Sequence, residues 1–348
     1  MTDKSVWNEE IPVPESLIQY VDEGVRDKLP PGTQVHGIRQ SGSSYWARTA
    51  KIDATDAAAE YYAMSLLHSV MPDLIVEPVA WGAYTEAPNT YFFLCRFYQF
   101  ATEFLEEEDD QGVKTVIEVN KLPDLKSFPE LVAEFHRRSE TKPGGEFGFP
   151  ITMYGGRNPQ TFPVSKTWEE CFSKGLDNIF DMEEKVQGVD AEMQQLREGL
   201  MTRVIPRLLR PLETEGRTVI PTLVHGDMWQ GNVAVDKATG RPIIFDATPL
   251  YAHHEYEMGP WWPTRHRLAR DYVAEYYKAW HGNSQPTEEF EDRVSLYAIV
   301  KEAMRELLNK YPLGYEGYLV EKGLVPAVDQ VAGNFSVAQA NKETLARA

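Results

Sequence analysis

The chain has 348 residues, 42% hydrophobic and 25% charged, which is enough for a globular protein with two lobes or domains. Its 35 lysines and arginines against 53 aspartates and glutamates give a net charge of −18, which argues against a nucleic acid or an anionic membrane as the main partner. No stretch approaches the run of about 20 apolar residues that a membrane span needs, and no apolar signal core is seen, so we expect a cytoplasmic protein. Cys95 and Cys171 are far apart, which disfavours both a disulfide framework and a zinc site.

The first hundred residues combine helix and strand patterns. A helix is predicted after Pro14, and the breaker at residues 30–32 ends it. A strand, a QSGSS turn and a second strand follow, and Gly42 and Ser43 of that turn either approach nucleotide phosphates or form a plain hairpin. The next helix begins near Ala57. Its Glu60 is a candidate partner for a phosphate-binding lysine or a solvated first-turn acid.

Two apolar stretches, residues 71–84 and 90–100, predict strands joined by a turn. The chain around Cys95 and Phe97 is then the expected hinge between two lobes, where backbone groups meet an adenine. The acidic run at residues 103–112 predicts a solvated loop.

The later part of the chain is mainly helical by its apolar periodicity, apart from a long loop rich in glycine and proline at residues 142–163. Pro206 is expected to kink or split the third of these predicted helices. These helices are expected at residues 127–140, 167–180, 182–212, 264–280 and 287–310.

The residues with the clearest catalytic spacing lie between Leu223 and Tyr256, in LVHGDMWQGNVAVDKATGRPIIFDATPLYAHHEY. In kinase-like catalytic loops an aspartate orients or accepts the proton of the acceptor hydroxyl, and an asparagine five positions later binds a metal. Asp227 and Asn232 have this spacing.

The residues after Asn232 read as two short strands around a polar turn in which Gly240 can take positive φ. Such a hairpin returns Asp246 to the neighbourhood of Asn232. An aspartate and an asparagine that share Mg²⁺ between nucleotide phosphates meet the main requirement of phosphoryl transfer.

Two other interpretations of this stretch remain open. The HGD and IFD segments can be ordinary strand ends with turn-capping side chains. A metal hydrolase is the second, although HExxH and the usual cysteine and histidine ligand patterns are missing; its ligands would be His225, Asp227, Asp246, His253 and His254.

Taken together, these features resemble the fructosamine kinase family of ketosamine and ribulosamine 3-kinases. The motifs that carry the resemblance are LVHGDMWQGNVAV, IFDATPLYAHHEYEMG and GFPITMYGGRNPQ with the following Trp168. The resemblance implies an α+β, bilobal, protein-kinase-like fold, related to that of aminoglycoside and choline kinases. We expect a small β-sheet lobe at residues 1–97 and a larger helical lobe at residues 98–348.

The resemblance also implies ATP and Mg²⁺ as cofactors and a small-molecule or protein-bound ketosamine as the substrate. Asp227 would be the catalytic base, Asn232 and Asp246 the metal ligands, and His225 the residue that holds the loop. Trp229 is expected beside the acceptor sugar, with core packing as its alternative.

In this resemblance, His254 and Glu255 align with the family's HxE motif. They are expected either to contact the substrate or to tie the catalytic loop in place.

One part of the family pattern is missing. The family carries a phosphate-binding lysine on a strand before the first-lobe helix, whereas here TAKIDATD runs directly into AAAEYYAMSLLHS. Lys51 is nearby but does not match the family position, so a truncated first-lobe sheet is expected. The alternatives to an active ketosamine kinase are therefore a pseudokinase that acts as a binding protein, or a kinase of the aminoglycoside or choline type, which the YxHxE segment disfavours.

Overall fold

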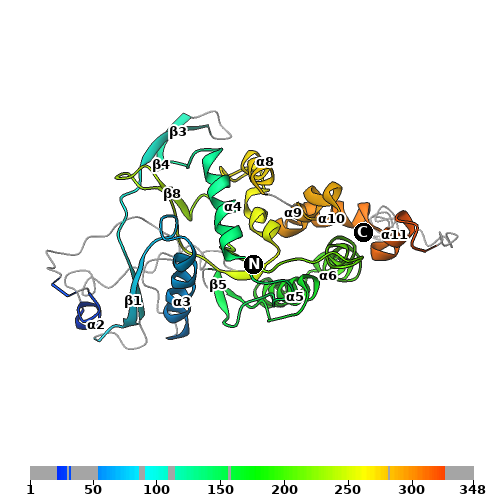
Figure 1. The fold of residues 1–348 in the computed structure, drawn as a ribbon, viewed down its shortest axis with the longest axis horizontal. Helices are drawn as coiled ribbons and strands as arrows, with labels where there is room; N and C mark the ends of the chain where they lie inside the picture. The colour runs from blue at the N-terminus through cyan, green and yellow to red at the C-terminus, as the bar shows by residue number, and fades with distance from the viewer. Residues whose placement is uncertain are drawn as a thin grey trace, which may run out of the picture.

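The computed structural model describes residues 22–29, 31–32, 54–85, 91–108, 114–155, 158–280 and 283–325. Helices and small antiparallel sheets make up these ranges, so the expected α+β class is confirmed. The strand-rich early part lies at one end of an elongated molecule, and the helices from α5 onward extend toward the other end (Figure 1). Gly42, Ser43 and Lys51 lie outside the described residues. The lobe boundary after residue 97 stays a prediction.

The described residues of the early part form two helices and one strand pair. Strand β1 (Pro78–Ala83) pairs antiparallel with β2 (Tyr91–Cys95), which confirms the two predicted strands. Helix α3 (Ala54–Val70) packs on this pair, and α2 (Glu23–Arg26) contacts β1. Neither strand carries a lysine.

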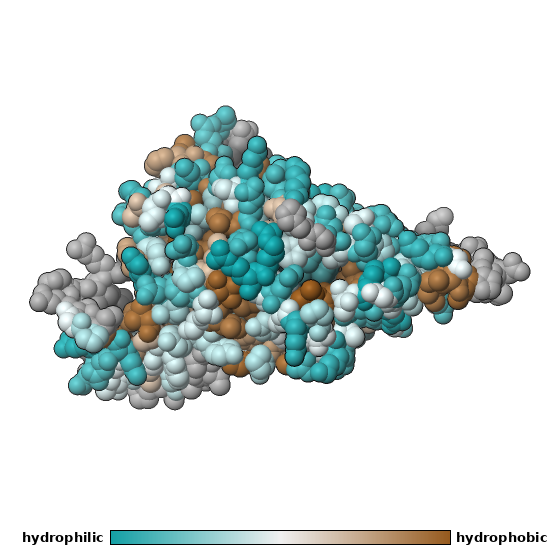
Figure 2. All heavy atoms as spheres, in the orientation of Figure 1, coloured by the Kyte–Doolittle hydropathy of each residue, from teal (hydrophilic) through white to brown (hydrophobic). Residues whose placement is uncertain are grey.

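The acidic run predicted as a loop forms most of a strand instead. Strand β3 (Thr102–Glu108) pairs with β4 (Lys114–Asn120) in a hairpin that projects from the molecule (Figure 1). From Thr102 to Glu106 the strand alternates between exposed and half-buried residues. Glutamates occupy positions of both kinds, so the sequence does not show the alternation of polar and apolar residues that is typical of a strand. Phe104 is 71% and Val116 65% exposed, and Figure 2 shows apolar surface where the hairpin projects.

The remaining helices surround a continuous hydrophobic core. Within the predicted long loop, β5 (Met153–Gly155) and β6 (Asn158–Gln160) form a small hairpin. The predicted helix at 287–310 is broken, because Ile299 takes a φ of +50° between two helices. The helical segments in chain order are α4 (Ser127–Ser139), α5 (Trp168–Gln187), α6 (Ala191–Gly199), the π-helix η2 (Leu200–Val204), α7 (Ile205–Leu209), η3 (Arg210–Glu213), η4 (His254–Trp261), α8 (Arg270–Ala279), η5 (Thr287–Glu289), α9 (Phe290–Ala298), α10 (Lys301–Lys310) and α11 (Gly314–Glu321). Pro206 lies in the first turn of α7, so the predicted 182–212 helix is split near it.

None of the helices in the described ranges has the length and apolar character needed to cross a membrane.

Two nested hairpins form the centre of the molecule. Strand β7 (Thr222–Val224) pairs with β10 (Leu250–Ala252), and between them β8 (Val233–Val235) pairs with β9 (Pro242–Ile244). The inner pair is the predicted hairpin, and Gly240 has the expected positive φ of +71°. Because one hairpin lies inside the other, the β7–β8 and β9–β10 connections lie side by side.

The inner hairpin is also tied to the early part of the chain. The backbone N–H of Ala101 donates to the Val235 carbonyl at 2.7 Å, and the N–H of Val76 donates to the Ile244 carbonyl at 3.2 Å. These bonds fix the segments that leave α3 and β2 against the two edges of the hairpin. The strand pair of the early part is thereby held near the two central connections.

Candidate active site

The β7–β8 and β9–β10 connections bring three of the predicted site residues together. The Asn232 side-chain amide donates to the Asp227 carboxylate at 3.0 Å and to the Asp227 carbonyl at 2.9 Å. The same Nδ2 lies 3.2 Å from the Asp246 carbonyl. The spacing in the sequence therefore corresponds to one cluster, and a side-chain carboxamide links both acidic residues.

His225 ties the two connections together through its ring. Its Nε2 donates to the Phe245 carbonyl at 2.9 Å, so its Nδ1 is the acceptor that faces the Asp227 N–H at 3.3 Å. The ring is fully buried, and burial lowers the pKa of His225, which keeps it neutral in this arrangement. The predicted role of holding the catalytic loop agrees with these contacts.

The electrostatics of the cluster raise the pKa values of its two aspartates. Burial, and then the negative charge of Asp246, raise the pKa of Asp227 from 3.8 to about 7. Partial desolvation also raises the pKa of Asp246, although this residue remains exposed to solvent. The charge of Asp246 disfavours ionisation of Asp227, and a bound cation or a proton relieves this repulsion.

Two backbone conformations at the cluster are unusual. Asp246 has a φ of +60°, a left-handed conformation that costs a residue other than glycine on the order of 1 kcal/mol. Gly226 has a φ of +82°, and a Cβ at this position would lie 2.1 Å from the Thr248 carbonyl oxygen. The HGD motif therefore needs its glycine for close packing of the two connections.

Glu257, a buried acid that the sequence analysis missed, binds the backbone of the catalytic loop. The Glu257 carboxylate accepts the backbone N–H groups of His225 at 2.5 Å and Gly226 at 3.0 Å, and it lies 3.4 Å from His136 Nε2. Burial alone would raise its pKa, but the bonds and charge of His136 and His225 hold the pKa of Glu257 below its usual value. The sequence feature that could have identified Glu257 is its place in the same motif, two residues after Glu255.

His254 and Glu255 do not reach the open part of the site. Both side chains are buried, and the Glu255 carboxylate binds the Arg293 guanidinium through two bonds of 2.6 and 2.9 Å. His254 bonds to Tyr276 Oη at 3.0 Å and stacks on Trp280. These contacts agree with the alternative, a structural tie, and a contact of either residue with the substrate stays a prediction. The histidine at HxE spacing is His253, which is also buried.

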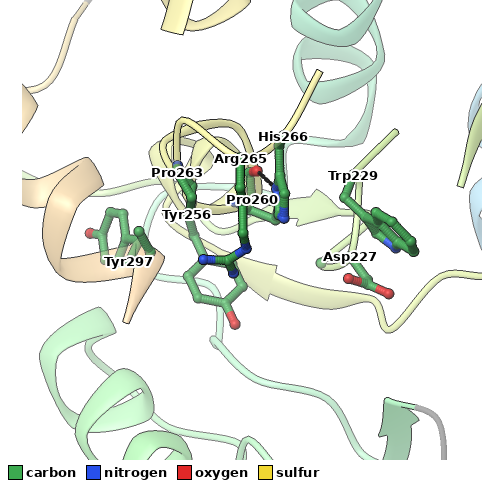
Figure 3. A pocket seen from close by; sticks show the side chains of 11 residues that line it. Asp227, Trp229, Tyr256, Pro260, Pro263, Arg265, His266 and Tyr297 are labelled. Atoms are coloured by element: carbon green, nitrogen blue, oxygen red, sulfur yellow. Dashed lines mark hydrogen bonds between the residues drawn. The ribbon is translucent and has the colours of Figure 1, made fainter. Parts of the chain in front are cut away.

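A pocket of about 390 Å³ opens on one side of Asp227 (Figure 3). Trp229 lies at its edge, 37% exposed, with its ring centroid 6.1 Å from that of His266. An exposed indole at a pocket agrees with the predicted sugar contact better than with core packing. The pocket is lined by Gly226, Asp227, Trp229, Tyr256, Gly259, Pro260, Pro263, Arg265, His266, Tyr297 and Ala298.

The predicted nucleotide residues lie in the early part of the chain. Glu60 on α3 is close enough to Cys95 at the end of β2 that its charge, after partial desolvation, raises the pKa of the thiol. Phe97 follows β2 and is 70% exposed. The structure thus brings Glu60 and Cys95 together and leaves the Phe97 ring accessible, and their contact with a nucleotide stays a prediction.

The donor atoms beside Asp227 fit a hard divalent cation. When Asn232 Nδ2 bonds to Asp227, its Oδ1 is the amide atom available to a metal, and Asp246 adds a carboxylate. Carbonyl and carboxylate oxygens are the ligands that Mg²⁺ takes in proteins. The other candidate, a cluster of His253, His254 and Glu255, has its nitrogens and oxygens engaged by Ser284, tyrosine hydroxyls and Arg293.

Comparison with known proteins settles the family. A family model described as fructosamine kinase matches residues 113–322, which is more than half of the chain. The chain belongs to the fructosamine kinase family. Among curated relatives of this fructosamine kinase family member, ketosamine-3-kinase of Mus musculus is 35% identical over 155 residues, covering 44% of this chain and 46% of the relative. The chloroplastic protein-ribulosamine 3-kinase of Oryza sativa subsp. japonica is 28% identical over 196 residues, covering 56% and 51%. The chain thus spans about half the length of the curated relatives it matches.

Solved structures confirm the fold. The crystal structure described as a fructosamine-3-kinase from Haemophilus somnus 129PT has a TM-score of 0.51 at 13% identity, over 73% of this chain and 78% of that one. The corresponding structure from Thermobifida fusca YX-ER1 has a TM-score of 0.50 at 14% identity, over 80% and 82%. The expected kinase-like α+β fold of this family is confirmed.

Proposed function

We propose that this fructosamine kinase family member transfers the γ-phosphate of ATP to a hydroxyl on the sugar part of a ketosamine. The observation that carries the proposal is the cluster in which Asn232 binds Asp227 and lies against Asp246, while Asp227 opens on a pocket. The names of the curated relatives, which are ketosamine and ribulosamine 3-kinases, support the choice of acceptor.

In this proposal the acceptor binds in the pocket with its sugar against the Trp229 indole. Asp227 accepts the proton of the attacking hydroxyl, the hydroxyl oxygen forms a bond to the γ-phosphorus, and the bond between that phosphorus and the bridging oxygen of ADP breaks. A pKa of about 7 lets Asp227 take this proton near neutral pH.

The remaining residues position the reacting groups. Asn232 and Asp246 would hold Mg²⁺, which when bound neutralises charge on the phosphates. His225 and Glu257 fix the backbone around Gly226, so the Asp227 carboxylate is held in one orientation. Glu60 and the chain around Cys95 and Phe97 are the proposed nucleotide contacts.

The test is turnover against a panel of acceptors. The chain is incubated with ATP and Mg²⁺ together with fructose-lysine, ribulose-lysine, an aminoglycoside or choline, and ADP and the phosphorylated acceptor are quantified. We expect phosphorylation of a ketosamine only. Phosphorylation of the aminoglycoside or choline instead would move the protein to another class of kinase, and nucleotide binding without any turnover would make it a pseudokinase.

A further inference from the structure

A second charged side chain lines the same pocket as Asp227. From its position we infer that Arg265 binds an anionic group of the acceptor, a carboxylate or a phosphate, at a distance from the hydroxyl that is phosphorylated. The inference rests on the proposed function, because it assigns a substrate feature to the same pocket.

Arg265 has no protein partner within the described residues. No hydrogen bond or ion pair joins it to them, although the chain carries 53 acidic residues. Nearby arginines are engaged: Arg267 binds Glu103 and the Asn120 carbonyl, and Arg270 lies 4.2 Å from the centre of the Trp262 ring. A guanidinium that lines a pocket without an acid beside it is available to a ligand.

The position of Arg265 assigns it to the acceptor and not to the nucleotide. The pocket is lined by Asp227 and Trp229, whereas the proposed metal ligands Asn232 and Asp246 are not among its lining residues. In Figure 3 the Arg265 side chain extends across the pocket beside His266 and toward Tyr256, while Asp227 and Trp229 stand on the other side. An acceptor held between the two sides would meet the base at one end and the cation at the other.

The segment that carries Arg265, residues 259–266, is fixed on the catalytic loop. Trp261 Nε1 donates to the Met228 carbonyl at 2.6 Å, and His266 Nδ1 donates to the Pro260 carbonyl at 2.5 Å. Gly259 packs so closely that a Cβ would lie 2.7 Å from the Tyr297 carbonyl oxygen. These contacts tie the segment on both sides of Arg265 to the catalytic loop and to α9, which suits a residue that positions a substrate.

The planar guanidinium binds carboxylate and phosphate in a bidentate manner. A ketosamine of a free amino acid carries an α-carboxylate, and one formed from a sugar phosphate carries a phosphate. A ketosamine on a lysine inside a polypeptide has an amide in place of the carboxylate. Arg265 should therefore favour adducts of free amino acids and adducts of sugar phosphates over an uncharged sugar on a lysine inside a polypeptide.

The experiment compares matched acceptors on the parent chain, on Arg265→Gln and on Arg270→Gln. The acceptors are fructose-lysine with a free carboxylate, the same adduct as a carboxamide, and a ribulosamine 5-phosphate. For the parent we expect a KM about tenfold lower for at least one anionic acceptor than for the carboxamide, as one charge-assisted bond would give. Arg265→Gln should remove this difference without changing the carboxamide KM, and Arg270→Gln, altered outside the pocket, should keep it.

The anionic acceptor whose KM responds identifies the source of the charge. An equal rise in KM for all acceptors, or a rise only in the KM for ATP, would overturn the inference. If the parent phosphorylates none of the acceptors, the proposed function fails, and calorimetric Kd values then decide the inference alone. Anion-selective binding that Arg265→Gln abolishes supports it, and binding without that selectivity overturns it.

Discussion

The proposed acceptor side and the proposed nucleotide side of the catalytic loop are built in different ways. On the proposed acceptor side, a pocket of about 390 Å³ is lined by residues around Asp227, by residues of η4 and the segment after it, and by the end of α9. On the nucleotide side, the described residues offer Asn232 and Asp246 from the central hairpins, Glu60 on α3, and a strand pair without a lysine. In the proposed function, the acceptor would therefore bind mainly to the catalytic loop, η4 and the segment after it, whereas ATP would need contacts from more distant parts of the chain.

Loss of the Asp246 carboxylate should have the largest effect on the nucleotide side. Because glycine adopts positive φ without strain, Asp246→Gly removes the charge and keeps the backbone at φ +60°. A metal supplies several kcal/mol of transition-state stabilisation, so we expect turnover to fall by about 10³-fold while Tm stays equal or rises. Steady-state rates and thermal unfolding measure both. Turnover within a few-fold of the parent would remove Asp246 from the metal site.

Two acids of η4 should separate support of the loop from support of the fold. Glu255→Gln leaves the buried Arg293 without its ion pair and should lower the free energy of unfolding by about 3–5 kcal/mol. Glu257→Gln should cost about 1–3 kcal/mol, since one of the two N–H groups that it binds loses its acceptor.

The order of the two variants should be reversed for activity: the variant that loses less stability should lose more kcat. Glu257→Gln should lower kcat more than Glu255→Gln does, at a temperature where both are folded, because Glu257 orients the backbone beside Asp227. Denaturant unfolding and kcat are measured on the same preparations. Losses of kcat that simply follow the losses of stability would contradict a positioning role.

The raised pKa of Asp227 predicts two opposite responses to pH. As a base with a pKa of about 7, it should lose about tenfold in kcat/KM for each pH unit below that value. In the unfolded chain its pKa is near 3.8, so the unfolded state releases the proton first and the free energy of unfolding falls as pH rises from about 4 to 7.

The Asp227→Asn variant removes that titration. Without nucleotide and metal, it should be more stable than the parent at pH 8, and the difference should shrink toward pH 4. Thermal unfolding across this pH range measures the difference. A gap that widens at acid pH would mean that the folded-state pKa of Asp227 is lowered and not raised.

Trp229→Ala should produce the smallest change, and on the acceptor side only. An aromatic face on a ligand contributes about 0.5–1.5 kcal/mol, so the KM for the ketosamine should rise by about two- to tenfold while the KM for ATP is unchanged. Steady-state kinetics with each substrate varied in turn measures both values. A change in the KM for ATP alone would place Trp229 on the nucleotide side.

Much of the central segment could be predicted from the sequence, because its geometry is local. A turn glycine and two short apolar strands determine the β8–β9 hairpin, and the hairpin determines that Asp246 returns to Asn232. Glu257 was missed because its role arises from the packing of η4 under the loop, and no spacing reveals a bond to a backbone N–H. The break at Ile299 and the strand formed by the acidic run likewise depend on tertiary neighbours.

For residues 1–97, the structure tests only part of the prediction. The β1–β2 pair and α3 were predicted, but the turn with Gly42 and Ser43 and the nearest lysine, Lys51, lie outside the described residues. The interpretation of the missing lysine strand therefore stays a prediction.

The most direct test of the account follows the γ-phosphate in the parent and in Asp227→Asn, with ATP affinity measured on the same samples. The account predicts that both bind ATP and Mg²⁺ with the same Kd, and that only the parent transfers phosphate to the ketosamine. Transfer by Asp227→Asn at the parental rate would contradict it.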